Sequence, residues 1–150
     1  AWFLCIVGML LYTMLYDIGA FKRFMYFIIL TYSVTIVIYL IFPTCQQLRP
    51  AAFPRDNLLT QMVGNFYAFD TNTNVCPSIH CQSSACMAIA FSGSTLARKK
   101  RWLKILAFGW AALICASTVF TKQHSIIDVF CGLAVALVWV PVLYLRPRKA

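Results

Sequence analysis

The two histidines of the chain each lie beside residues that could make them chemically active. His124 and Asp128 are four positions apart, so on a helix they share one face. There the carboxylate can fix the imidazole tautomer and support positive charge on the ring. A histidine held in this way is a good nucleophile or base. The alternative is a plain capping pair at a helix start, which an aspartate inside an apolar run makes less favourable.

His80 ends the short run Pro77-Ser78-Ile79-His80. Proline and serine favour the first turn of a helix. A helix N-terminus presents unpaired backbone N–H groups and the positive end of the helix dipole, which suits a phosphate. His80 on that turn would lie beside the bound anion, where it could transfer protons. The alternative is an ordinary serine-capped helix with an interfacial histidine.

Arg49 and Lys122 are two cations that could bind phosphoryl oxygens. Arginine presents a planar fork of N–H donors that matches a phosphate. Each residue also has a simpler interpretation, Arg49 as a solvated loop residue and Lys122 as an interfacial anchor. Neither cation identifies a site by itself.

The composition of the 150-residue chain indicates a membrane protein. Hydrophobic residues make up 61% of it and charged residues 11%, whereas a soluble domain has roughly 25% charged residues. The 13 lysines and arginines, set against four aspartates, occur in short clusters between apolar runs, as in the flanks of membrane helices. These features exclude a water-soluble globule, a disordered chain and a nucleic-acid partner, and membrane lipids are the expected surroundings.

Five apolar runs predict five membrane-crossing helices, over residues 2–16, 24–43, 79–97, 103–121 and 126–145. We therefore expect an all-α, polytopic transmembrane helical bundle that forms a single membrane-embedded domain over residues 1–150. The third run is rich in small residues, which let helices approach closely, so it should be central. Between Arg55 and Tyr67 the spacing predicts an amphipathic helix, either lying in the membrane interface or capping the bundle.

Clusters of lysine and arginine set the expected orientation. Residues 22–23, 98–104 and 146–149 should face the cytoplasm. Five crossings threaded through these anchors place residues 43–78 and 121–128 on the other side, which is the periplasm, the cell exterior or a lumen. That side holds ionisable residues from three separate segments: Arg49, His80, Lys122, His124 and Asp128. Ionisable groups at membrane depth are costly and usually functional, so this convergence is the strongest functional signal in the sequence.

In order and internal spacing, these residues resemble the three motifs of the type 2 phosphatidic acid phosphatase superfamily, which includes the vanadium haloperoxidases. The motifs are K-x6-R-P, P-S-G-H and S-R-x5-H-x3-D. Their counterparts here are Arg49-Pro50, residues 77–80, and Ser117-Thr118 followed by His124 and Asp128. The resemblance covers about residues 40–140. Six helices are usual in the family, so a further helix is expected before Ala1.

The chain departs from the family pattern at three positions. Phe42 stands where the family has the lysine of the first motif, Ile79 replaces the glycine of the second, and Thr118 replaces the arginine of the third. Two phosphate-binding cations are thus absent from the motifs, and Lys122 is placed to replace one of them. The run T-K-Q-H-S at residues 121–125 resembles the third motif of a bacterial-type branch, so we interpret the departures as a subfamily pattern.

The resemblance implies an integral membrane phosphatase that hydrolyses a lipid phosphomonoester or diphosphate through a phosphohistidine intermediate. His124 would attack phosphorus, Asp128 would orient it, and His80 would protonate the leaving alkoxide and then activate water. The phosphoryl oxygens would be held by Arg49, Lys122 and the Ser78 turn. The scheme requires no metal and no other cofactor, and the aspartates are too few and too scattered for a two-magnesium site.

Three alternatives remain open from the sequence. A phosphotransferase on the same scaffold, similar to sphingolipid synthases, would pass the group from His124 to an alcohol. The two histidines could instead ligate a haem in an electron-transfer protein, although a haem would explain neither Arg49 nor the Asp128 spacing. The third alternative is a transporter or a degenerate, inactive family member, which Phe42 and Thr118 favour.

Overall fold

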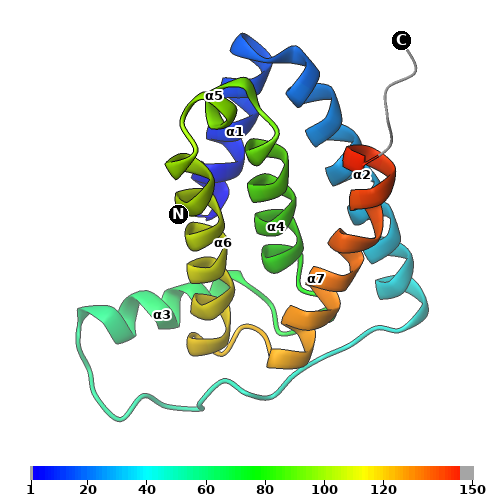
Figure 1. The fold of residues 1–150 in the computed structure, drawn as a ribbon. Helices are drawn as coiled ribbons and strands as arrows, with labels where there is room; N and C mark the ends of the chain where they lie inside the picture. Colours follow the sequence, from blue (N-terminus) through cyan, green and yellow to red (C-terminus); the bar gives the residue numbers. More distant parts are fainter. Residues whose placement is uncertain (1, 146–150) are drawn as a thin grey trace.

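The computed structural model describes residues 2–145, and they form α-helices and one short π-helix (Figure 1). The elements are α1 (Trp2–Tyr16), α2 (Ile18–Ile41), α3 (Leu58–Phe69), α4 (Ile79–Ser92), α5 (Thr95–Lys99), α6 (Trp102–Phe120), α7 (Ile126–Val140) and η1 (Pro141–Leu145). This arrangement confirms the predicted all-α helical bundle. The predicted basic cluster at residues 146–149 lies outside the described residues.

Helix α4 lies at the centre of the bundle, as its small residues predicted. It packs against α1, α2, α6 and α7, and Figure 1 shows these helices around it. Small side chains are prominent on its buried surface: Ser83, Ser84, Ala88 and Ala90. Because small residues allow close helix packing, the first turn of α4, which carries His80, is brought near the ends of several other helices.

Helix α2 begins earlier than predicted. The charges of Lys22 and Arg23 placed its start at residue 24, but the structure begins the helix after Asp17. The Asp17 carboxylate caps the helix by accepting the backbone N–H of Ala20 at 3.0 Å. The two cations therefore lie inside the helix, where their long side chains can extend toward lipid head groups.

The α-helices in two of the predicted runs, residues 79–97 and 126–145, end earlier than the runs themselves. Helix α4 ends at Ser92, because Gly93 interrupts it and Ser94 then caps the short helix α5. Helix α7 ends at Val140. Pro141 lacks a backbone N–H and cannot continue the α-helical hydrogen bonds, so the chain passes into the π-helix there.

The amphipathic helix predicted between Arg55 and Tyr67 is confirmed as α3. Asn57 and Thr60 begin it with a reciprocal capping box. Figure 1 shows α3 extending away from the end of the bundle at which α4 and α7 begin. Its large apolar side chains are exposed: Leu58, Leu59, Met62, Phe66 and Phe69. This exposure favours a helix that lies in a membrane interface over one that caps the bundle.

Within residues 2–145, three helical segments are long and apolar enough to cross a membrane: Ile18–Ile41, Trp102–Phe120 and Ile126–Tyr144. Helix α1 is also apolar but has 15 residues, and the central helix α4 has 14. Because a helix rises by about 1.5 Å per residue, α4 is shorter than the roughly 30 Å hydrocarbon core of a bilayer. It is held in place by the longer helices around it.

Candidate active site

The two histidines meet at the end of the bundle where α4 and α7 begin. His80 lies on the first turn of α4, and His124 lies in the loop between α6 and α7. The Nδ1 atom of His80 is 3.2 Å from the Nε2 atom of His124, and their ring centroids are 5.4 Å apart. Residues 44 positions apart in the sequence are thus joined by a direct hydrogen bond.

The loop that carries His124 turns back on the end of α6. The Thr118 carbonyl accepts the N–H groups of Gln123 at 2.9 Å and of His124 at 3.2 Å. Lys122 has a φ of 56°, in the left-handed region that costs a non-glycine residue ~1–2 kcal/mol. This turn buries His124, which is 7% exposed, and aims its ring at α4.

Asp128 has two neighbours on the first turn of α7. Its Oδ2 atom accepts the Ser125 N–H at 2.7 Å, while the Ser125 hydroxyl accepts the Asp128 N–H at 3.3 Å. The same Oδ2 atom lies 3.9 Å from Nδ1 of His124. Among the described residues, this buried Nδ1 has no hydrogen-bond partner. Asp128 therefore caps α7 and also places a negative charge beside the His124 ring.

Ser78 does not line the cavity beside the two histidines but connects the helices that carry the site residues. Its side chain is fully buried, and its hydroxyl accepts the Cys81 N–H at 3.3 Å as the cap of α4. Its own N–H donates to the Asp128 carbonyl at 3.0 Å. The start of α4 is thereby tied to the start of α7, which sets the spacing between His80 and the loop that carries His124.

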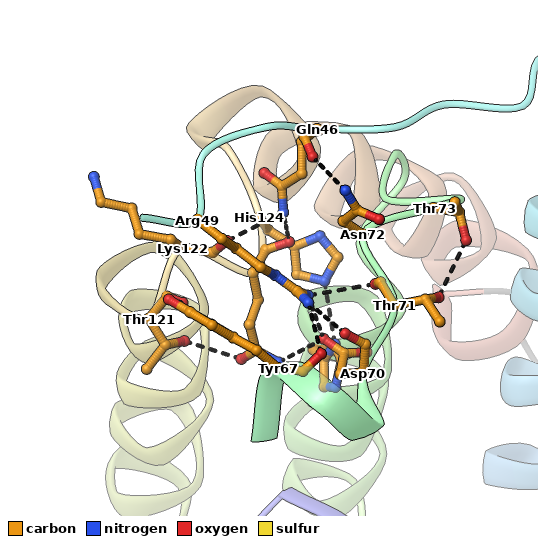
Figure 2. A network of polar contacts seen from close by, with 12 residues as sticks. Gln46, Arg49, Tyr67, Asp70, Thr71, Asn72, Thr73, Thr121, Lys122 and His124 are labelled. Atoms are coloured by element: carbon orange, nitrogen blue, oxygen red, sulfur yellow. Dashed lines mark hydrogen bonds and ion pairs between the residues drawn. The ribbon is translucent and has the colours of Figure 1, made fainter. Parts of the chain in front are cut away.

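Arg49 is held at the C-terminus of α3, as Figure 2 shows. Its guanidinium lies 4.7 Å from the centre of the Tyr67 ring and forms a 3.1 Å ion pair with Asp70. It also donates to the backbone carbonyls of Tyr67, Asp70 and Thr71. Cations are favourable at a helix C-terminus, so these bonds anchor Arg49 firmly. Among the described residues, its buried Nε has no hydrogen-bond partner.

Lys122 is the predicted site residue that the structure does not bring to the histidines. Its side chain is exposed, and Figure 2 shows it pointing away from Arg49 and Asp70. The lysine backbone still contributes to the site, because its carbonyl accepts a hydrogen bond from Gln46 at 3.3 Å.

A cavity of about 290 Å³ opens beside the two histidines. It is lined by Tyr39, Asp70, Thr71, Thr73, Asn74, Val75, Ile79, His80, Gln123 and His124. Of the predicted site residues, His80 and His124 line it, whereas Arg49 lies next to it and Ser78 and Asp128 lie behind its wall. Ile79, which replaces the family glycine, presents an apolar side chain to this cavity.

Among the polar residues of this wall that sequence reasoning missed are Asp70 and Gln123. The Asp70 Oδ2 atom accepts hydrogen bonds from Arg49 Nη2 at 3.1 Å and from Gln123 Nε2 at 2.9 Å. Asp70 belongs to no motif, and its only signal was a carboxylate on the same predicted side as the histidines. Gln123 lies within the T-K-Q-H-S run, where the motif assigns a role to His124 but none to the glutamine.

The two other departures from the family motifs do not reach the cavity. Phe42 ends α2 and is 67% exposed. Thr118 is 2% exposed, and its hydroxyl donates to the Cys115 carbonyl at 2.8 Å. Neither side chain replaces the missing cation at its position.

Burial favours the neutral form of His124. Burial lowers the pKa of His124 below the usual 6.5, while the Asp128 and Asp70 carboxylates oppose this shift. A neutral imidazole has one nitrogen with a proton and one with a free lone pair. With the proton on Nδ1, facing Asp128, the lone pair of Nε2 points at His80 and at the cavity. This arrangement can perform nucleophilic attack and proton transfer on a ligand that enters between the rings.

Comparison with known families gives one match. The family model described as PAP2 superfamily matches residues 23–150, which include every motif discussed above. No curated protein and no solved structure gives a significant match to the chain.

Proposed function

The chain belongs to the PAP2 superfamily, and we propose that it is an integral membrane phosphatase that hydrolyses a lipid phosphate through a phosphohistidine intermediate. The observation that carries the proposal is the 3.2 Å contact between His80 and His124 at a polar cavity. Two imidazoles in contact, one of them buried beside a carboxylate, supply a nucleophile and a proton donor in one place.

The proposed reaction has two steps. In the first, Nε2 of His124 attacks phosphorus, the ester P–O bond breaks, and protonated His80 gives its proton to the leaving alkoxide. In the second, neutral His80 takes a proton from water, the hydroxide attacks phosphorus, and the P–N bond breaks. Inorganic phosphate leaves, His124 regains its lone pair, and His80 is protonated again. Asp128 stabilises the positive charge that His124 carries while it is phosphorylated.

Substrate must part the two rings for this reaction to occur. In-line attack places Nε2 about 3–3.5 Å from phosphorus, and His80 must reach the leaving oxygen on the far side at about 2.6–3.2 Å. The 3.2 Å between the two nitrogens is too short to hold both contacts. His80 or the His124 loop therefore moves outward when the phosphoryl group enters.

Three groups are proposed to hold the phosphoryl oxygens. Arg49 offers its Nε–H, which has no hydrogen-bond partner among the described residues. The turn after Ser78 offers the backbone N–H groups at the start of α4. Lys122 must swing inward from its exposed position, which its flexible four-carbon side chain permits. These donors replace the two cations absent from the family motifs, and the scheme uses no metal ion.

The lipid chain is proposed to lie between α1, α4 and α6. An apolar cavity of about 460 Å³ there is lined by residues that include Met9, Met87 and Phe91. His80, Met87 and Phe91 follow one another at helical spacing on α4. Trp2 packs against α4 beside His80, because its ring centroid is 4.5 Å from that of His80 and its indole N–H donates to Ser83. A hydrocarbon chain in this groove would leave its phosphate at the histidines.

The membrane orientation supports a site on the non-cytoplasmic face. Three segments are long and apolar enough to span a membrane. The basic residues of α5 and its flanks lie at the end of α4 opposite to His80. Because lysine and arginine clusters remain in the cytoplasm, we propose a multi-pass protein whose histidines face the periplasm, the cell exterior or a lumen.

The decisive experiment measures phosphate release from lipid monophosphates by the purified protein in detergent with EDTA. We expect release by the wild type and none by His124→Ala, with both proteins eluting as folded species in size-exclusion chromatography. Equal release by the two proteins would refute the histidine mechanism. A strict requirement for added magnesium would also count against it.

A phosphotransferase is the second candidate, and the cavity wall favours it. Thr71, Thr73 and Asn74 present hydroxyl and amide groups beside the histidines, where an acceptor alcohol could bind in place of water. Adding alcohols to the same assay would then yield a phosphorylated alcohol at the expense of inorganic phosphate. Unchanged phosphate release, with no new ester, would leave hydrolysis as the activity.

A further inference from the structure

The carboxylate of Asp70 occupies a wall of the histidine cavity. Asp70 directly follows α3, and its side chain is 31% exposed. Its Oδ2 atom accepts hydrogen bonds from Arg49 at 3.1 Å and from Gln123 at 2.9 Å. Figure 2 shows Asp70 beside the Arg49 guanidinium, at the start of the α3–α4 connection. The proposed mechanism makes no use of this group.

Arg49 does not need the Asp70 carboxylate to stay in place. The guanidinium also donates to the backbone carbonyls of Tyr67 at 3.2 Å and of Thr71 at 3.4 Å, and to that of Asp70. It stacks on the Tyr67 ring as well. Replacing the carboxylate with an amide would keep all these contacts. The separate contribution of the Asp70 side chain is therefore its charge.

The Asp70 carboxylate contributes negative charge to the wall of the cavity. Among the described residues that line it, Asp70 is the acidic side chain. The adjacent cation, Arg49, is already paired with this carboxylate. One phosphoryl group between the histidines can use the Arg49 Nε–H and the N-terminus of α4. A second phosphoryl group would bring further negative charge toward Asp70, whose neighbouring cation Arg49 is already engaged in the ion pair.

We propose that Asp70 is a specificity-determining residue, whose carboxylate limits the site to lipids with a single phosphoryl group and disfavours lipid diphosphates. The inference rests on the proposed phosphatase function and narrows its substrate class to phosphomonoesters. A like charge acts more strongly against the substrate that carries more negative charge, which is how specificity is obtained by repulsion.

The kinetic test compares a prenyl monophosphate with the prenyl diphosphate of equal chain length. We expect the wild type to favour the monophosphate in kcat/KM by at least about tenfold. Asp70→Asn should reduce this ratio by about tenfold, mainly by improving use of the diphosphate. The matched control is Asp56→Asn, because Asp56 is an exposed aspartate whose carboxylate bonds to Gln61 outside the cavity. The control should keep the wild-type ratio.

A second variant guards against loss of folding in Asp70→Asn. Thr71 lines the cavity beside Asp70, and its hydroxyl lies near that of Thr73 on the exposed side. Thr71→Lys adds a cation to the wall while keeping the Asp70 contacts. It should also shift the ratio toward the diphosphate. A wild type that uses both lipids equally, or folded variants that keep the wild-type ratio, would overturn the proposal.

A binding measurement separates this proposal from the phosphatase function. Orthophosphate and pyrophosphate are titrated into the purified protein, and Kd is obtained from the shift of the thermal midpoint. We expect the wild type to bind orthophosphate more tightly than pyrophosphate. Asp70→Asn should reduce the ratio of the two Kd values by about tenfold. If no lipid phosphate is hydrolysed, the proposed function fails, while the two Kd values still test the role of Asp70. An unchanged Kd ratio would refute that role.

Discussion

Gly132 of α7 packs so closely on Ser78 that a Cβ at position 132 would lie 2.5 Å from the Ser78 carbonyl oxygen. Real Cβ atoms do not approach backbone oxygens to this distance, so α7 can lie against the start of α4 only with glycine there. The same contact sets how far the Asp128 turn lies from the His80 turn. Close packing at one glycine thus helps to hold the two halves of the candidate site together.

Gly132→Ala should therefore harm both stability and activity. The added methyl must push α7 away from α4, and such overpacking typically costs about 1–3 kcal/mol. We expect a lower thermal midpoint and at least about a tenfold loss of kcat. Gly109→Ala is the matched control, because nothing lies within 4 Å of a Cβ at that position of α6. Equal behaviour of the two variants would show that the α4–α7 contact does not position the site.

His80→Gln should reduce activity by an amount that depends on how much protonation the leaving group needs. If His80 protonates the leaving alkoxide, its loss costs about 10²–10⁴-fold with a lipid phosphate. With a nitrophenyl phosphate, the nitrophenolate leaves without protonation. The rate of the first step with this substrate should therefore fall much less in the variant. The measurement compares the fall in kcat/KM for the two substrates. A similar loss for both would assign His80 to binding instead of proton transfer.

The acid limb of the pH profile of kcat/KM should lie below pH 6.5. Burial lowers the pKa of His124 from 6.5, so its nucleophilic free base persists as the pH falls through that value. The Asp128 carboxylate opposes this shift, so Asp128→Asn should lower the pKa of His124 further and move the acid limb of kcat/KM to still lower pH. The maximal rate should fall at the same time, because the phosphorylated ring loses its charge partner. A limb that moves to higher pH in the variant would contradict the assignment of Asp128.

The histidine pair was predictable from the sequence because short-range rules position each of its members. A Pro-Ser start places His80 on a first helical turn, and the charge clusters predicted that His124 lies on the same side of the membrane. Helix ends were less predictable, since Lys22 and Arg23 masked a start that the Asp17 cap determines. Hydropathy treats such cations as boundaries, although their side chains can extend from within a helix.

The remaining features of the site depend on contacts between distant segments. Asp70 reaches the cavity because Arg49 and Gln123, 21 positions before it and 53 after it, bond to its carboxylate. No local pattern encodes such a meeting. Lys122 shows the opposite case, a residue that the sequence places near the site and the structure does not. A left-handed turn directs its side chain outward, although His124 two positions later points inward.

Lys122→Ala tests whether that lysine swings into the site. If it supplies a cation missing from the motifs, kcat/KM should fall by about 10²–10³-fold, as expected for loss of one donor that stabilises the phosphoryl group in the transition state. Lys99→Ala is the control, since Lys99 is an exposed lysine of α5 at the other end of the bundle. A loss no larger than that of the control would assign Lys122 to anchoring at the membrane interface.

Filling the apolar cavity should separate lipid binding from chemistry. Ala107 of α6 lines this cavity with Met87 of α4 and Met9 of α1, so Ala107→Trp would occupy the space proposed for the hydrocarbon chain. We expect KM for a long-chain lipid phosphate to rise about tenfold or more, because the chain loses its buried apolar contacts. Hydrolysis of a short, water-soluble phosphate ester should change little, since the histidines lie outside this cavity. If the variant instead lost both activities while remaining folded, the cavity would be supporting the site, and the lipid chain would have to lie elsewhere.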